Sequence, residues 1–133
     1  WEGGVELAGH AVRVGVTGYS QHSADFIQYR SNLPGEPTYV NLGGARVRGA
    51  ELTVTASIDR STVLTGHLSL ISSEVTDTGA VSSPIFALGI SLQRRPGATA
   101  ALSATRQVGG GSVSLTGTWL GERDDADYRS FPA

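Results

Sequence analysis

The 133-residue sequence predicts an all-β fold, an antiparallel meander of about six long strands. Apolar and polar residues alternate over long stretches, as they do in strands whose two faces meet different environments. Glycine contributes 18 residues and aromatic side chains only 7%, a composition that disfavours helix and leaves few large groups for a core. Short turns recur near residues 10, 60 and 110, at a spacing of about 50 residues.

The first hairpin is predicted over residues 1–31. Its opening strand covers residues 1–8, and residues 9–10 form a short turn into a second strand that runs from 11 to about 31. Residues 32–38 contain two prolines and a glycine, which cannot continue a strand ladder, so a longer connection is expected there. In the second strand, apolar residues alternate with polar or small ones at Val12, Val14 and Val16.

The second hairpin joins a strand over 39–58 to one over 63 to about 75, through a turn at 59–62. The first of these strands is chemically sorted. Leu52, Val54, Ala56 and Ile58 fall on one face, and Glu51, Thr53, Thr55 and Ser57 on the other. A second long connection is expected over about 76–84.

The third hairpin is predicted from a strand over 85–107, a turn at Gly109 to Gly111 and a strand over 112–120. The polar tail that follows is expected to open another loop. Tight turns therefore lie at one end of the meander and long connections at the other, as in outer-membrane barrels. The strands also reach the roughly 9 to 11 residues that a membrane-crossing strand needs. The pattern favours part of a transmembrane β-barrel.

Two alternatives stay open. One is a soluble β-sandwich or small β-barrel that acts as a binding or adhesion module, for example for carbohydrate, and the other is a closed barrel made by two such chains. In a sandwich, the apolar residues converge on a second sheet. In a barrel wall they form one continuous outward band, with Thr53, Ser69 and Thr116 facing the other way.

Composition narrows the function classes. A net charge of -2 and a pI near 5.9 provide no basic surface for nucleic acid. Cysteine is absent, which excludes disulfides and thiolate metal sites. The sequence carries no Gly-x-Ser-x-Gly, His-Glu-x-x-His or phosphate-loop motif, and Gly109 to Ser112 joins two strands. We therefore expect neither enzymatic activity nor a cofactor.

Four collinear segments resemble the carboxy-terminal part of a TonB-dependent outer-membrane receptor. They are DFIQY at Asp25 to Tyr29, YVNLGGARVRGAEL at Tyr39 to Leu52, LQRRPGATAAL at Leu92 to Leu102, and WLGERDD at Trp119 to Asp125. The most specific is the aromatic-x-Asn that precedes Ala-Arg-Val-Arg-Gly-x-Glu. The resemblance spans nearly the whole chain in the expected order.

The resemblance implies a 22-stranded barrel in a Gram-negative outer membrane that takes up siderophores, cobalamin or similar nutrients. Its partners are then membrane lipid and the nutrient, with TonB and the plug domain engaged only in the full-length parent. This chain departs from the family pattern, because it lacks the plug, the coupling motif and a final aromatic-ended strand. Six strands cannot enclose a channel. We expect residues 1–133 to be a single segment of barrel wall, a fragment of a longer protein.

Candidate ligand-binding residues lie toward the long-loop end. Tyr29 and Tyr39 flank one loop and are placed to touch a nutrient, while Arg46 and Arg48 suit an anionic ligand or a lipopolysaccharide phosphate. Solvated charges near a strand end are the alternative for both arginines. We expect Glu51, Thr53 and Thr55 to face the lumen, where Glu51 would pair with lumen or plug cations.

The other polar clusters provide weaker evidence for a binding site. The carboxylates of Asp124, Asp125 and Asp127 suit Ca2+ chemically but lack EF-hand spacing, so we expect a solvated loop and no metal. The three histidines, His10, His22 and His67, are too scattered to predict a metal site. An aromatic girdle at the lipid interface is expected from Tyr19, Phe26, Tyr29, Tyr39, Phe86 and Trp119.

Overall fold

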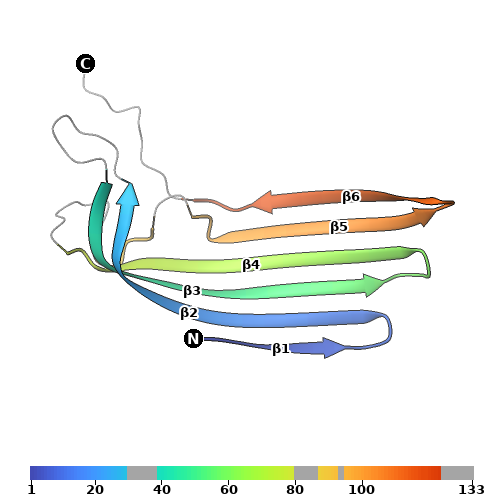
Figure 1. Cartoon of the computed structure of the whole chain (residues 1–133), viewed down its shortest axis with the longest axis horizontal. Helices are drawn as coiled ribbons and strands as arrows, with labels where there is room; N and C mark the ends of the chain where they lie inside the picture. Colours follow the sequence, from blue (N-terminus) through green and yellow to red (C-terminus); the bar gives the residue numbers. More distant parts are fainter. Residues whose placement is uncertain (30–38, 80–86, 93–94, 124–133) are drawn as a thin grey trace, which may run out of the picture. The chain divides into compact units, whose positions relative to one another are not determined.

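The computed structural model describes residues 1–29, 39–79, 87–92 and 95–123. Throughout these ranges the only regular elements are strands, which form one antiparallel sheet in sequence order (Figure 1). The predicted six-stranded meander is confirmed. The strands are β1 (Glu2–Ala8), β2 (Val12–Tyr29), β3 (Tyr39–Ser57), β4 (Thr62–Asp77), β5 (Ala98–Val108) and β6 (Gly111–Leu120).

Where the chain is described, no helix is long and apolar enough to cross a bilayer.

Three tight turns join β1 to β2, β3 to β4 and β5 to β6. In the first, the Gly9 N–H donates to the Val12 carbonyl at 2.7 Å, and in the second the Ile58 N–H donates to the Thr62 carbonyl at 2.9 Å. The third closes over Gly109, whose φ of 58° is a left-handed conformation that glycine adopts without a side-chain clash. The connections after β2 and β4 are much longer, as the sequence predicts.

The chain divides into two compact units, which we treat separately. The turn-end unit comprises residues 1–20, 48–71 and 96–122, and includes all three tight turns. The loop-end unit comprises residues 21–47 and 72–95, together with the residues that follow 122.

Strand register in the turn-end unit is fixed by direct pairings. Val5 pairs with Val16, Leu68 with Ala100, and Ala100 in turn with Trp119. Two observations give the β2–β3 register. The Ser57 N–H donates to the Ala11 carbonyl at 2.7 Å. A Cβ added at Gly15 would lie 2.7 Å from Thr53 Oγ1, so Gly15 is opposite Thr53. The β3–β4 register follows from the Ile58–Thr62 hydrogen bond.

This register sorts the side chains onto two faces. We call the first the apolar face; its members are Val5, Leu7, Val12, Val14, Val16, Leu52, Val54, Ala56, Leu64, Gly66, Leu68, Leu70, Ala98, Ala100, Leu102, Ala104, Val113, Leu115, Gly117 and Trp119. The opposite, polar face carries Glu6, Arg13, Thr17, Tyr19, Glu51, Thr53, Thr55, Thr65, His67, Ser69, Ser103, Thr105, Ser114 and Thr116. The sorting extends across all six strands because paired residues of antiparallel strands share a face.

The loop-end unit holds a small hydrophobic core of Leu42, Ala45, Val75 and Leu92, with Val47 packed against it. Leu92 belongs to residues 87–92, which form no strand although they hydrogen-bond to β4: Val75 donates to the Ile90 carbonyl and Gly89 to the Val75 carbonyl, both at 2.9 Å.

The expectation of a strand from Ile85 is therefore wrong, since β5 begins only at Ala98. Residues 85–86 lie outside the described ranges. Beyond them, Gly89 has a φ of 80°, which turns the chain out of the extended conformation that a strand requires.

Candidate functional site

The apolar face of the turn-end unit is not covered by other described residues. The residues Leu7, Leu102 and Leu115 are 69%, 60% and 76% exposed, although a soluble sandwich would bury such residues against a second sheet. Leaving each of these side chains in water forgoes about 1.5–3 kcal/mol of transfer free energy. This face is therefore suited to an apolar surrounding.

The polar face is rich in hydroxyl groups over β4 to β6. Ser103 Oγ accepts a hydrogen bond from Thr116 Oγ1 at 2.9 Å, and the Thr105 and Ser114 hydroxyls lie 2.8 Å apart. Over β1 to β3 the same face carries charged groups, including an ion pair of 3.6 Å between Arg13 Nε and Glu6 Oε1. Groups of this kind are suited to an aqueous surrounding.

The three residues expected to face a lumen lie together on this polar face. Glu51, Thr53 and Thr55 alternate along β3 with Leu52 and Val54, which belong to the apolar face. Both threonines are exposed and Glu51 is partly buried. Their shared face is a feature of the structure, whereas a role in lining a lumen stays a prediction.

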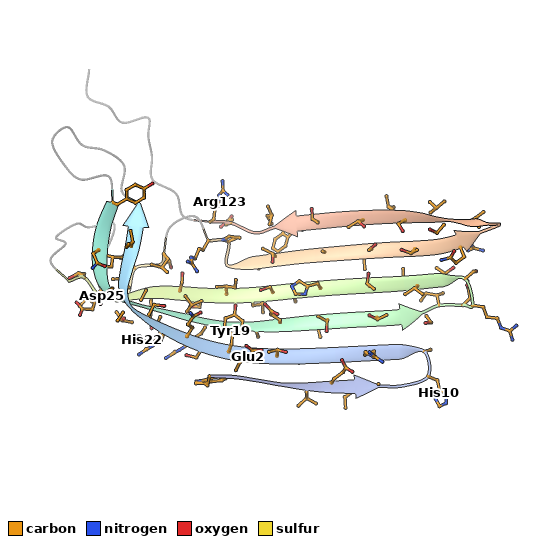
Figure 2. The ribbon with its side chains drawn as sticks, in the orientation of Figure 1. Glu2, His10, Tyr19, His22, Asp25 and Arg123 are labelled. Atoms are coloured by element: carbon orange, nitrogen blue, oxygen red, sulfur yellow. The ribbon has the colours of Figure 1, made fainter. Side chains whose placement is uncertain are left out.

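Tyr19 also lies on the polar face, where its register partner on β1 is Glu2 (Figure 2). Its ring covers Gly49 on β3, so that a Cβ added at Gly49 would collide with the tyrosine ring. The expectation that Tyr19 belongs to a lipid-facing girdle is therefore wrong, because a glycine on the neighbouring strand provides space for the ring on the opposite face. Trp119 lies on the apolar face, as a girdle residue must.

Tyr39 and Arg46, two of the four candidate ligand-binding residues, belong to the loop-end unit. Arg46 of the loop-end unit pairs with Glu74, with 3.2 Å between Nη1 and Oε1, and both side chains are about 40% exposed (39% and 40%). Tyr39, at the start of β3, is 65% exposed. Arg48 belongs to the turn-end unit, and the side chain of Tyr29 lies outside the described residues.

The β3–β4 turn is organised by Asp59, whose carboxylate accepts three hydrogen bonds. Oδ1 accepts from the Ser61 N–H at 2.7 Å and from Ser61 Oγ at 2.8 Å, and Oδ2 accepts from Thr62 Oγ1 at 3.1 Å. The Ser61 side-chain bond and then its backbone bond are the main causes that lower the pKa of Asp59 from 3.8 to about 2.

No metal centre is found in the part of the chain that the structure describes, where no three metal-ligating side chains gather. The candidate carboxylates Asp124, Asp125 and Asp127 lie outside that part.

Comparison with known protein families shows to which family the chain belongs. A family model described as TonB dependent receptor-like, beta-barrel matches residues 1–132. The chain belongs to the TonB-dependent receptor β-barrel family. No curated protein matches it significantly. A barrel of this family explains why one face of the sheet is apolar and uncovered while the other is hydrophilic.

Sequence analysis of this TonB-dependent receptor chain missed one feature of the site. Arg48 has the same parity along β3 as Leu52 and Val54, so the alternation already placed it on the apolar face. Because its side chain is cationic, Arg48 was interpreted as a ligand-binding residue, and its position among the apolar residues of the same face was overlooked. Arg106 has the same parity along β5 as Leu102 and Ala104, which also places it on the apolar face, but the sequence analysis did not consider it.

Proposed function

We propose that this chain is a single segment of the wall of an outer-membrane receptor, which imports a scarce nutrient such as a siderophore or cobalamin with energy supplied through TonB. The observation that carries the proposal is the uncovered apolar face, which continues across all six strands of the turn-end unit. The family match supports it. Members of this family are transporters, so we propose no enzymatic role.

In this proposal the two faces of the wall meet different partners. Lipid of a Gram-negative outer membrane surrounds the apolar face, and the polar face with Glu51, Thr53 and Thr55 lines the lumen against the plug of the full-length parent. Tyr29, Tyr39 and Arg46 lie toward the long connections, where a nutrient arriving from outside would first touch the receptor. The family and the exposed position of Tyr39 support this assignment.

Cysteine labelling tests the wall directly, because the sequence has no cysteine of its own. Single variants Leu68→Cys and Leu115→Cys probe the apolar face, and Thr53→Cys and Thr118→Cys are matched controls on the polar face. After refolding into phosphatidylcholine vesicles, a water-soluble maleimide should label the two controls and spare the two apolar positions.

Equal labelling at all four positions would contradict the wall function. A monomeric chain that melts cooperatively in plain buffer would instead favour the soluble binding module, in which the apolar face must be covered by other parts of the protein.

A further inference from the structure

Arg48 lies at the long-loop edge of the apolar face. The neighbouring Gly49 is on the polar face beneath Tyr19, so Arg48 projects from the opposite side of β3, and its side chain is exposed. The β2–β3 register places Ser20 opposite Arg48, and the Ser20 N–H donates to the Trp1 carbonyl at 2.9 Å. Trp1, Ser20 and Arg48 therefore form one row across β1, β2 and β3.

Arg106 lies at the other edge of the same face, near the tight turns. It pairs with Thr62 on β4 and Val113 on β6. Its neighbour Thr105 contacts Ser114 through hydroxyl groups on the polar face, so Arg106 projects from the apolar face, where it is exposed. Along the strands of the turn-end unit, Arg48 and Arg106 are the charged residues on this face.

The separation of the two arginines fits a bilayer. The register of β3, β4 and β5 places Arg106 level with Ile58, ten residues beyond Arg48 along β3. Ten residues span about 33 Å of strand, and a strand tilt of about 40° reduces this to about 25 Å along the membrane normal. That height is the usual height of the lipid-facing apolar band of an outer-membrane barrel, about 25 Å.

We propose that Arg48 and Arg106 bind the phosphates of lipid headgroups, one at each edge of the apolar face, and so fix the depth of the sheet in the membrane. This inference rests on the proposed wall function. A guanidinium group presents several N–H donors to phosphate oxygens, and a long side chain reaches the interface while its stem stays on apolar surface. An arginine on a lipid-facing barrel surface costs about 2–4 kcal/mol at the midplane but little at the interface.

The other residues in the row of Arg48 also fit a position at the depth of the lipid headgroups. Tryptophan concentrates at membrane interfaces, and Trp1 lies in the row of Arg48, just beyond the apolar residues of β1. The next rows toward the tight turns contain only apolar residues and glycine, from Ala50 to Ala56 along β3, and the row of Ile58 contains Arg106. Polar groups thus return to this face at both edges of one apolar band.

Lipid selectivity tests the proposal. The chain, kept soluble in detergent micelles, is diluted into vesicles of phosphatidylcholine alone and into vesicles in which about a third of the lipid is phosphatidylglycerol, and tryptophan fluorescence reports binding. Arg48→Gln and Arg106→Gln should each reduce the preference for the anionic vesicles about fivefold, the effect of one basic residue near an anionic surface. Arg13→Gln is the matched control, because Arg13 lies on the polar face beside Glu6 and should leave the preference unchanged.

Spin labels provide a second readout that separates the two proposals. Labels at Arg48→Cys and Arg106→Cys should report headgroup depth, and a label at Leu102→Cys should report the acyl-chain region. If Leu102 is deep but both arginine positions lie in bulk water, or if both glutamine variants behave like Arg13→Gln, the headgroup assignment is overturned and the wall function stands. A water-exposed label at Leu102 in every vesicle contradicts the wall function, and the headgroup assignment falls with it.

Discussion

At the scale of single residues, the fold depends on a tyrosine that covers a glycine. The Tyr19 ring occupies the space where a side chain at Gly49 would stand, and the Leu70 carbonyl would lie 2.8 Å from an added Cβ at the same position. An aromatic side chain over a strand glycine shields the backbone and compensates for the packing that the glycine lacks. Contacts of this kind fix the positions of β2 and β3 on the polar face.

We expect Gly49→Ala to destabilise the folded chain by roughly 1–3 kcal/mol, because both Tyr19 and the backbone of β4 must move. Urea unfolding in detergent micelles measures the change. Gly117→Ala is the control, since an added Cβ there meets nothing within 4 Å. In Tyr19→Ala/Gly49→Ala part of the loss should be recovered, and strictly additive losses would argue against the ring contact.

The Asp59 turn predicts a specific dependence on pH. The folded-state pKa of Asp59 is about 2, below its ordinary 3.8, so its hydrogen bonds stabilise the turn above about pH 4. That stabilisation should decline as the pH falls from about 4 to about 2. A carbon NMR titration of the Asp59 carboxyl group should report the low pKa, and Ser61→Ala should raise it, because the largest contribution comes from the Ser61 hydroxyl. An unshifted carboxyl in the parent chain would contradict this turn geometry.

At the scale of elements, the tight turns set the register of each hairpin. The two-residue turn between β5 and β6 requires a left-handed conformation at Gly109, with a φ of 58°, and none at Gly110. A non-glycine residue pays about 1–2 kcal/mol in that conformation. We therefore expect Gly109→Ala to lower the free energy of unfolding by about that amount, while Gly110→Ala has little effect. Equal effects of the two variants on urea unfolding would refute the assigned turn.

Element by element, the sequence predicted those strands whose two faces meet different surroundings. Leu64, Gly66, Leu68 and Leu70 alternate with hydroxyls and His67 along β4, and this period of two reveals a strand without any knowledge of its partners. The prediction of a strand from Ile85 failed because an apolar run looks the same whether it extends a sheet or folds over a small core. Leu92 folds over the small core, and its burial depends on contacts with residues distant in the sequence.

The candidate site was less predictable than the fold. The ion pair between Arg46 and Glu74 joins residues 28 positions apart, and it can be found only when the β3–β4 register is known. The face of Tyr19 was predictable from parity, yet the propensity of aromatic residues for lipid interfaces suggested the other side. The face of Arg48 was likewise contained in the alternation along β3.

At the scale of the whole molecule, the sheet has two unpaired edges. Among the described strands, β1 pairs only with β2 and β6 only with β5. Unpaired backbone groups at an edge favour further strand pairing, and in lipid each unsatisfied group costs several kcal/mol.

We therefore expect the isolated chain to aggregate in plain buffer and to associate in detergent through its edges. Circular dichroism with sedimentation in both media tests this, and a stable monomer in detergent would mean that the edges are satisfied in another way. The expectation applies to residues 1–133 taken alone.

The alternation of faces along β2 to β6 also restricts how the gene can change in length. Deleting one residue from the middle of β4 would turn every following side chain of that strand to the other face, moving leucines into water and hydroxyls into lipid. Codons inside these strands are therefore expected to tolerate substitution far better than single insertions or deletions. Length variation among descendants of this gene should be confined to the connections, and inside a strand it should occur as pairs of residues.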